Sequence, residues 1–296
     1  GVLQQVDFTG SRYLPLFALA VVANMYIRAL TLALLVNSPK HIPTGSWMAI
    51  SSAHNLSTSL SKLFLGDAIL VWLMNRFDIQ WQKSLFTTVI ARFFELPPLI
   101  LLLFLGLVGN PRLFPGQELW IALSGLAFAT SFTLLFGLHR IIELLPSRLW
   151  FGQEARVLQF DKAYRQLLDR CMGRLLILSV WKTVSALLFY VFAMRLFSID
   201  LSLWEEFMVF GVFNFASIFP VQGIMGLGTF EAYFSIGLIL LGWPSSKALV
   251  LGFCIHMLFL VSFILLVLAC FLPIIVRPRM HRRAFVNEGS MDKEKP

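Results

Sequence analysis

Two acidic side chains lie inside otherwise apolar stretches and are the strongest candidates for chemistry. Glu231 follows Gly228 by three residues, and Asp67 directly follows Gly66. A carboxylate at membrane depth costs about 3 kcal/mol to insert and usually has a partner and a function, such as contact with a polar substrate. The alternatives are that Glu231 satisfies backbone N–H groups at the start of its own helix, and that Asp67 forms an internal ion pair with Lys62.

An amide and a helix-breaking segment precede each acid. Asn55 lies upstream of Asp67 in a run rich in serine and threonine, and Asn214 lies upstream of Glu231. The break before Glu231 contains one proline and three glycines, which are Pro220, Gly223, Gly226 and Gly228. Such residues interrupt a helix. Glycines also let the backbone approach a ligand, although close helix packing is an equal alternative.

Basic side chains near these segments could balance the charge of a phosphate. Arg28 lies within the first apolar run, where its side chain can reach toward the inner membrane surface. Lys182 is interpreted in the same way. Arg92 and Glu95 are one helical turn apart and could pair with each other on one helix face.

The sequence shows no catalytic constellation. His54 and His256 are isolated, and the three cysteines lack zinc-site spacing. No nucleophile elbow, metalloprotease, P-loop or dinucleotide motif occurs. We therefore expect no enzymatic activity, no cofactor and no metal.

The composition places these residues in a membrane. Of the 296 residues, 58% are hydrophobic and only 14% are charged, whereas soluble domains carry about a quarter charged residues. Mean hydropathy is +0.78, and several apolar runs exceed the roughly 18 residues of a candidate spanning helix. The net charge of +8 gathers between apolar runs, as the positive-inside rule expects. Topology and anionic lipid headgroups explain this charge, so no nucleic acid partner is expected.

Five apolar runs are long enough to cross a hydrocarbon core of about 30 Å. They cover residues 13–36, 85–108, 119–138, 175–197 and 248–276. Segments 47–75 and 207–243 are too polar or too interrupted for a lipid-facing helix, so they should be buried in protein or line a cavity. We interpret both as re-entrant units in an all-α protein with about six spanning helices.

The sequence divides into two membrane halves and two hydrophilic parts. The halves cover 1–138 and 175–276, and between them a loop at 139–174 has apolar residues at every third or fourth position. That pattern is typical of an amphipathic helix in the membrane interface. The loop and the basic tail at 277–296 are expected to be cytoplasmic, with the tail disordered.

The two halves show the same order of segments, which is a span, a re-entrant unit and a span. The charge distribution gives them opposite orientations. Inverted repeats whose broken helices meet near the midplane recur in secondary transporters. We therefore expect an inverted repeat; a chance likeness between two polar breaks is the alternative.

The best motif resembles that of a known family. The segment F-P-V-Q-G-I-M-G-L-G-T-F-E-A, followed by an apolar run and L-G-W-P, resembles the Pro, Gly-x-Gly, Glu signature of the lysylphosphatidylglycerol synthase transmembrane-region family. Asn55 with Gly66-Asp67 is similar to that family's Asn…Gly-Asp/Glu segment. A-R-F-F-E-L, which contains Arg92 and Glu95, is similar to its Glu-Arg-x-x-Asp-type helix.

The chain also departs from this family. It has Ser57, Ser59 and Lys62 where the family usually carries a proline and a basic residue. Family members tend to have a further span before the first one here, which would explain a start without Met. These residues contain no acyltransferase-like domain of the kind that makes aminoacyl-phospholipids in the family, so synthase activity is not expected of them.

The resemblance implies a flippase-like function in a bacterial inner membrane. We expect a phospholipid or polyprenyl-linked intermediate to move between leaflets, with its headgroup in a polar crevice between the two broken segments. The headgroup contacts are expected from Asn55, Asp67, Asn214 and Glu231, the phosphate-balancing charges from Arg28, Lys62 and Arg92 beside Glu95, and the opening from Gly223 to Gly228.

Two other functions stay open at this stage. A membrane-embedded lipid transferase would use the same acids as general bases and needs a second catalytic group. A non-transporting accessory subunit would bind a lipid synthase through the amphipathic helix. A lipid synthase or glycosyltransferase partner and a homo-oligomer are compatible with the sequence.

Overall fold

The protein is all helical in the described part of a computed structural model, which comprises residues 9–36, 42–60, 65–110, 113, 116–144, 154–216 and 228–276. A short 3-10 helix, η2 (Thr9–Tyr13), leads into the first α-helix. The α-helices are α1 (Leu14–Val36), α2 (Thr44–Leu60), α3 (Leu65–Asn75), α4 (Trp81–Gly109), α5 (Gln117–Leu144), α6 (Glu154–Leu196), α7 (Leu203–Ala216), α8 (Thr229–Leu240) and α9 (Ser245–Val276).

Five of the described helices are long and apolar enough to cross a membrane, which makes this a multi-pass membrane protein. They are α1, α4, α5, the second part of α6, and α9. Because α2, α3, α7 and α8 have 17, 11, 14 and 12 residues, each falls short of the roughly 20 residues that a full crossing needs. The two segments expected to be broken therefore contain pairs of short helices. Their re-entrant course stays a prediction.

The packing partners of the two halves interchange. α1 packs against α6, α2 packs against α9, and α4 packs against α7. When α1, α2, α3 and α4 are matched in order to α6, α7, α8 and α9, the contact between α1 and α6 maps onto itself. The contact between α2 and α9 maps onto that between α7 and α4, and the reverse. The contacts within one half, such as α2 with α3 and α3 with α4, map onto α7 with α8 and α8 with α9.

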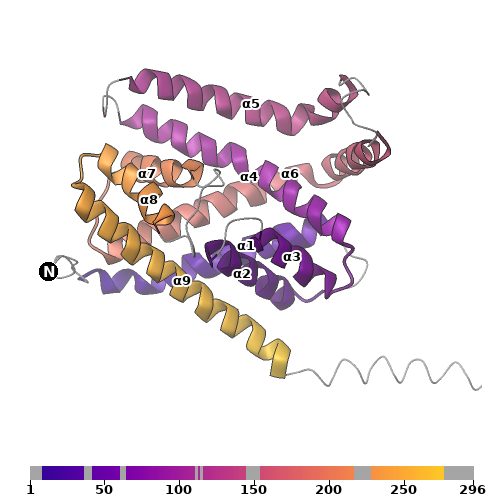
Figure 1. Ribbon diagram of the computed structural model, residues 1–296, viewed down its shortest axis with the longest axis horizontal. Coiled ribbons are helices and arrows are strands. Elements are labelled where there is room, and N and C mark those ends of the chain that lie inside the picture. Colours follow the sequence, from indigo (N-terminus) through magenta and orange to yellow (C-terminus); the bar gives the residue numbers. More distant parts are fainter. Residues whose placement is uncertain are drawn as a thin grey trace, which may run out of the picture.

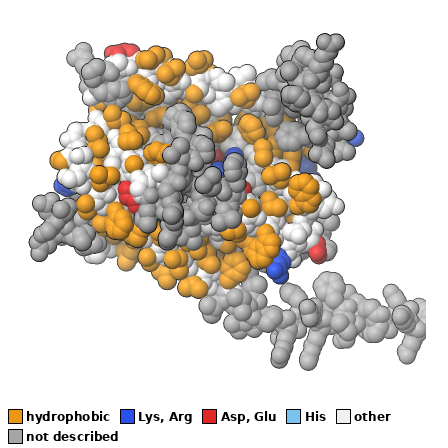
Figure 2. All heavy atoms as spheres, in the orientation of Figure 1, with side chains coloured by type: hydrophobic (Ala, Val, Ile, Leu, Met, Phe, Trp, Pro, Cys, Tyr) orange, Lys and Arg blue, Asp and Glu red, His pale blue; other side chains and the backbone are white. Residues whose placement is uncertain are grey.

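Helix α5 has no counterpart in this scheme. It packs beside α4 at one edge of the molecule, at the top of Figure 1, and makes a smaller contact with α6. Only 11% of its most apolar window is buried, and large hydrophobic side chains such as Leu119, Leu126 and Phe132 are exposed. Hydrophobic side chains also cover much of the face in Figure 2. Such surfaces are expected to face lipid.

The amphipathic stripe predicted within 139–174 forms the first part of α6, which continues without interruption into a spanning helix. Tyr164, Cys171 and Leu175 are buried in a cluster with Ile90 and Leu135 of α4 and α5. The described part of the stripe therefore packs against the protein's own helices, and its position relative to the membrane interface stays a prediction. The polar face, including Lys162 and Arg170, is exposed.

Tyr164 ties this part of α6 to α5. Its hydroxyl donates a hydrogen bond of 2.6 Å to the backbone carbonyl of Leu135, and its side chain is fully buried. Burial raises the pKa of the Tyr164 hydroxyl to about 12, so the proton that this bond requires stays in place at neutral pH.

Tyr164→Phe is therefore expected to lower the free energy of unfolding by about 1–2 kcal/mol, because a buried carbonyl loses its donor while the ring still fills its site. Thermal unfolding in detergent measures the change. Tyr26→Phe is the matched control, since the Tyr26 side chain is 45% exposed and should show no shift. Equal melting temperatures for the two variants would contradict a role for this hydrogen bond.

Candidate functional site

Side chains from α1, α2, α3 and α4 converge on Asp67, in the first turn of α3. Arg92 of α4 donates hydrogen bonds of 3.0 and 3.1 Å to its two carboxylate oxygens. His54 of α2 lies 2.9 Å from Oδ1 through its Nε2 atom. Arg28 of α1 contacts His54 Nδ1 and donates to the amide oxygen of Asn55. Four helices are thus joined through one polar network.

The partners of His54 determine its protonation state. A guanidinium has donors and no acceptor, so His54 Nδ1, which contacts Arg28, must present its lone pair. The ring proton then lies on Nε2 and is donated to Asp67. His54 is therefore a neutral imidazole whose two nitrogens are both engaged.

A second ion pair adjoins this network one turn along α4. Glu95 pairs with Lys182 of α6, whose side chain is only 13% exposed. Asn24, one turn before Arg28 on α1, donates to the backbone carbonyl of Lys182 at 2.9 Å and so holds α6 against α1. We call the whole set the arginine–aspartate cluster; its members are Arg28, His54, Asn55, Asp67, Arg92, Glu95 and Lys182.

The arginine–aspartate cluster has more positive than negative charges. Its three cations, Arg28, Arg92 and Lys182, face two carboxylates, and His54 is neutral. The described members therefore carry one net positive charge. Arg92 has the most open side chain of the cations, with 58% exposed compared with 26% for Asp67.

Most hydroxyls of the polar helix α2 bond to its own backbone. Ser57 and Thr58 donate to the carbonyls of His54 and Asn55, and Ser52 donates to that of Met48 at 2.8 Å. These bonds satisfy hydroxyls that would otherwise need water. The helix can therefore be buried and still present His54 and Asn55 to Arg28.

Gly66 brings α3 close to α2. A Cβ atom at this position would collide with the Thr58 side chain and lie 3.0 Å from its Cα. A larger residue would push the start of α3, and with it Asp67, away from α2. Lys62, the other basic residue predicted in this segment, lies outside the described residues.

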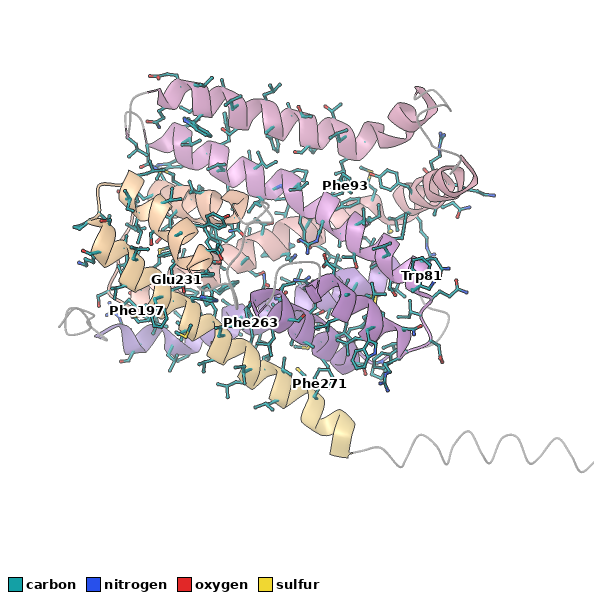
Figure 3. All side chains as sticks on the ribbon, viewed as in Figure 1. Trp81, Phe93, Phe197, Glu231, Phe263 and Phe271 are labelled. Atoms are coloured by element: carbon teal, nitrogen blue, oxygen red, sulfur yellow. The ribbon has the colours of Figure 1, made fainter. Side chains whose placement is uncertain are left out.

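The acid of the second half has a different partner. Glu231 Oε1 lies 2.9 Å from Nδ1 of His256 on α9, and Figure 3 shows Glu231 where α8 lies against α9. The side chains are 8% and 2% exposed. The His256 ring stacks on Phe230 with centroids 4.3 Å apart. We call these two residues the glutamate–histidine pair.

Glu231 also caps its own helix, as one sequence interpretation expected. Its Oε2 atom accepts a hydrogen bond of 2.7 Å from the Gly228 backbone N–H. Gly228 has a φ of 82°, which glycine adopts at little cost. The capping interpretation is therefore confirmed for Oε2, while Oε1 meets His256, and a functional role of Glu231 stays a prediction.

The remaining predicted residues of the second half are only partly described. Asn214 lies near the end of α7 and donates to the Phe210 carbonyl at 2.8 Å. Pro220, Gly223 and Gly226 lie outside the described residues. In the described part of the chain, Asp67 and Glu231 share no ion-pair partner.

The two acids occupy equivalent places in the two halves. Asp67 is the third residue of α3 and Glu231 the third of α8. The positive partner of Asp67, Arg92, is the twelfth residue of α4 counted from Trp81; His256 is the twelfth of α9 counted from Ser245. Both acid–partner pairs are 25 residues apart. Asn55 and Asn214 are likewise the twelfth residues of α2 and α7.

Three sequence interpretations of charged residues need correction. Arg92 and Glu95 do not pair with each other, because each faces a partner on another helix. Lys182 does not reach the membrane surface, since Glu95 holds it inside the bundle. Arg28 is likewise held inside, by His54 and Asn55 of α2.

The two histidines were also missed as site residues, although neither is isolated in space. Asp67 contacts His54, and Glu231 contacts His256. The equal spacing of 25 residues between each acid and its partner was a signal in the sequence that could have found His256.

The described residues contain no group of three or more His, Cys, Asp and Glu side chains placed to hold a metal ion. The site as described offers fixed charges and hydrogen bonds around Asp67 and a buried acid–imidazole contact at Glu231. A phosphate is the complementary ligand for an excess of guanidinium and ammonium groups.

Comparison with known proteins gives one family. Residues 2–270 match the family described as the lysylphosphatidylglycerol synthase TM region. No curated protein and no solved structure matches. Since the match covers most of the 296 residues, the chain belongs to the lysylphosphatidylglycerol synthase TM region family.

Proposed function

We propose that this protein moves an anionic phospholipid, or another lipid whose headgroup carries a phosphate, between membrane leaflets without covalent chemistry. The observation that carries the proposal is the net positive charge of the arginine–aspartate cluster, with Arg92 as its exposed member. Membership of a family of membrane domains named for a lipid synthase supports a lipid as substrate.

The energetics favour an anion at this cluster. The three cations and two carboxylates leave one positive charge without a countercharge among the described residues, and such a charge is costly in a medium of low dielectric constant. A phosphate would neutralise it. Arg92 can accept a second anionic partner because its guanidinium has five donors, and Asp67 occupies one nitrogen of it.

The interchanging helix contacts support two repeated units as the moving parts. We infer that α1–α4 and α6–α9 are inverted repeats with re-entrant pairs α2–α3 and α7–α8, as in several transporter folds. The glycine-rich segment from Gly223 to Gly228 would allow the second unit to open. The loop between α5 and α6 and the basic tail would lie in the cytoplasm of a bacterial cell, beneath its inner membrane.

A covalent transferase is less well supported by the geometry. His54 is the group nearest to Asp67 that could act as a base. Arg28 occupies the Nδ1 lone pair of this histidine, and Nε2 carries the proton donated to Asp67. A general base needs a free lone pair facing substrate.

Arg92→Gln tests the proposal. Proteoliposomes of phosphatidylethanolamine and phosphatidylglycerol, with a trace of NBD-labelled phosphatidylglycerol, report leaflet exposure through dithionite quenching. We expect movement of the labelled lipid to slow by about tenfold, because one charged hydrogen-bond partner of a phosphate is worth about 1.5–3 kcal/mol. Arg76→Gln is the matched control, since Arg76 is an exposed arginine that stacks on Trp72, 4.7 Å from its ring, outside the cluster.

Three results would count against the proposal. If wild-type protein leaves the labelled lipid in its original leaflet, the proposed function is wrong. Equal slowing by Arg92→Gln and Arg76→Gln would show that the arginine–aspartate cluster is not the binding site. A lipid whose mass changes during the assay would favour the transferase.

A further inference from the structure

The two equivalent acids differ in the partner that lies 25 residues further along the chain, which is an arginine for Asp67 and a histidine for Glu231. Asp67 is held by Arg92, whose guanidinium stays protonated at every accessible pH. Glu231 is held by His256, and an imidazole, unlike a guanidinium, has a neutral as well as a protonated form. The same position in the two halves therefore carries a fixed charge in one and a titratable group in the other.

Because the glutamate–histidine pair is buried, the net charge that one proton adds to it has a large electrostatic effect. Both side chains of the glutamate–histidine pair are less than a tenth exposed. The imidazole donates from Nδ1 to Glu231 Oε1, and in the described part of the chain no hydrogen bond reaches its Nε2. With a neutral imidazole the pair carries one negative charge, and one added proton at Nε2 makes it neutral. A buried pair of zero net charge avoids an uncompensated carboxylate.

We propose that the glutamate–histidine pair is a proton-binding site whose occupancy is coupled to lipid movement, with one proton exchanged for each lipid. This inference rests on the function proposed above and names its energy source. The proton enters from water on one side to Nε2 of His256, gives an imidazolium–carboxylate pair, and leaves from Nε2 to water on the other side. The lipid keeps all its covalent bonds.

Aromatic packing connects the pair to the arginine–aspartate cluster. Phe230 stacks on His256, and its ring centroid is 4.6 Å from that of Phe213 on α7. Both phenylalanines belong to a core against which Leu56 of α2 packs, next to Asn55. Helix α2 also packs directly on α9. A change in the position of His256 therefore reaches the helix that presents His54 and Asn55 to Arg28, as coupling between two sites requires.

Other ionisable groups near the pair have different surroundings. On the helices packed against α8 and α9, no described ionisable side chain forms a hydrogen bond or ion pair with Glu231 or His256 other than these two with each other. The charged or titratable groups considered are Arg28 on α1, His54 on α2, Lys182, Tyr190 and Arg195 on α6, Glu205 and Glu206 on α7, Tyr233 on α8, and Lys247 and Cys254 on α9. His256 is therefore the group expected to exchange the proton.

A pH gradient across the same proteoliposomes tests the coupling. At equilibrium, with the membrane potential held at zero by potassium and valinomycin, exchange of one proton per lipid converts a difference of one pH unit into an about tenfold difference of labelled lipid between leaflets. We expect this response from the wild-type protein. His256→Gln keeps a donor for Glu231 without a titratable group, and His256→Arg reproduces the pairing of the first half. Both should leave the leaflet ratio near one while the lipid still exchanges.

His54→Gln is the matched control, because it removes the imidazole that contacts the other acid, Asp67. This variant should keep the response to the gradient whatever its rate of lipid movement. A proton-release measurement on wild-type protein in detergent, with NBD-labelled phosphatidylglycerol added, needs no variant and should show one proton per bound lipid.

Three outcomes would overturn the proton site while leaving lipid movement intact. They are a wild-type protein that moves lipid without responding to the gradient, a His256→Gln protein that keeps the response, and lipid binding without proton exchange. A wild-type protein that moves no lipid would instead overturn the proposed function.

Discussion

Arg28→Gln should slow lipid movement at least tenfold and lower the free energy of unfolding by about 2 kcal/mol. Arg28 is the link between α1 and α2, because it contacts both Asn55 and His54. The glutamine amide can still donate to one of these two acceptors, so one hydrogen bond from a charged donor is lost, and such a bond contributes about 1.5–3 kcal/mol. The same change makes the arginine–aspartate cluster electrically neutral. The lipid assay and thermal unfolding in detergent measure the two effects.

Arg28→Lys separates the contribution of charge from that of geometry. Lysine keeps the positive charge but lacks the planar fork that allows arginine to bind two acceptors. We expect the lysine variant to recover most of the lipid movement and only part of the stability. If the glutamine and lysine variants move lipid equally slowly, the charge at Arg28 is not what attracts the headgroup.

Lys182→Met should have the largest effect on stability, lowering the free energy of unfolding by about 3 kcal/mol. Lys182 is mostly buried and pairs with Glu95, whose side chain is 30% exposed. Removing one partner of such a pair leaves an uncompensated carboxylate inside the bundle, which is strongly destabilising. Methionine fills a similar volume, so the loss of packing is small.

A double-mutant cycle tests this prediction. Lys182→Met combined with Glu95→Gln removes both charges, and hydrophobic or neutral replacements of a buried pair are often close to neutral. The double variant should therefore be less destabilised than Lys182→Met alone, with a coupling energy of about 1–3 kcal/mol. Additive losses in the double variant would show that the two residues act independently.

Much of the helical arrangement was predictable because it follows from local composition. The apolar runs at 13–36 and 248–276 became α1 and α9 with ends within a few residues, since length and hydropathy decide such helices. The start of α8 directly after Gly228 was predictable because glycine acts locally. The acids themselves were found because charge is rare in apolar sequence.

The partners of the acids were harder to predict, because pairing depends on which helices become neighbours. Arg92 and Glu95 are close in sequence, and nothing local shows that α3 and α6 would supply the partners of each. The amphipathic stripe of α6 was correctly recognised as apolar, but periodicity cannot distinguish a face that meets lipid from one that meets α4 and α5. Only the comparison of the two halves would have indicated His256.

Helix α5 explains how the two units proposed above as inverted repeats, α1–α4 and α6–α9, can have opposite orientations in the membrane. A unit made of two crossings and a re-entrant pair, as proposed for α1–α4, returns the chain to the leaflet where it began. A copy joined directly to its end would start from that same leaflet and would have the same orientation as the first. One additional crossing between the units makes the number of crossings odd. Helix α5 can provide this crossing, since its exposed surface is apolar and it packs mainly against α4. Its contribution is the number of crossings, which requires length and hydrophobicity but no particular side chain.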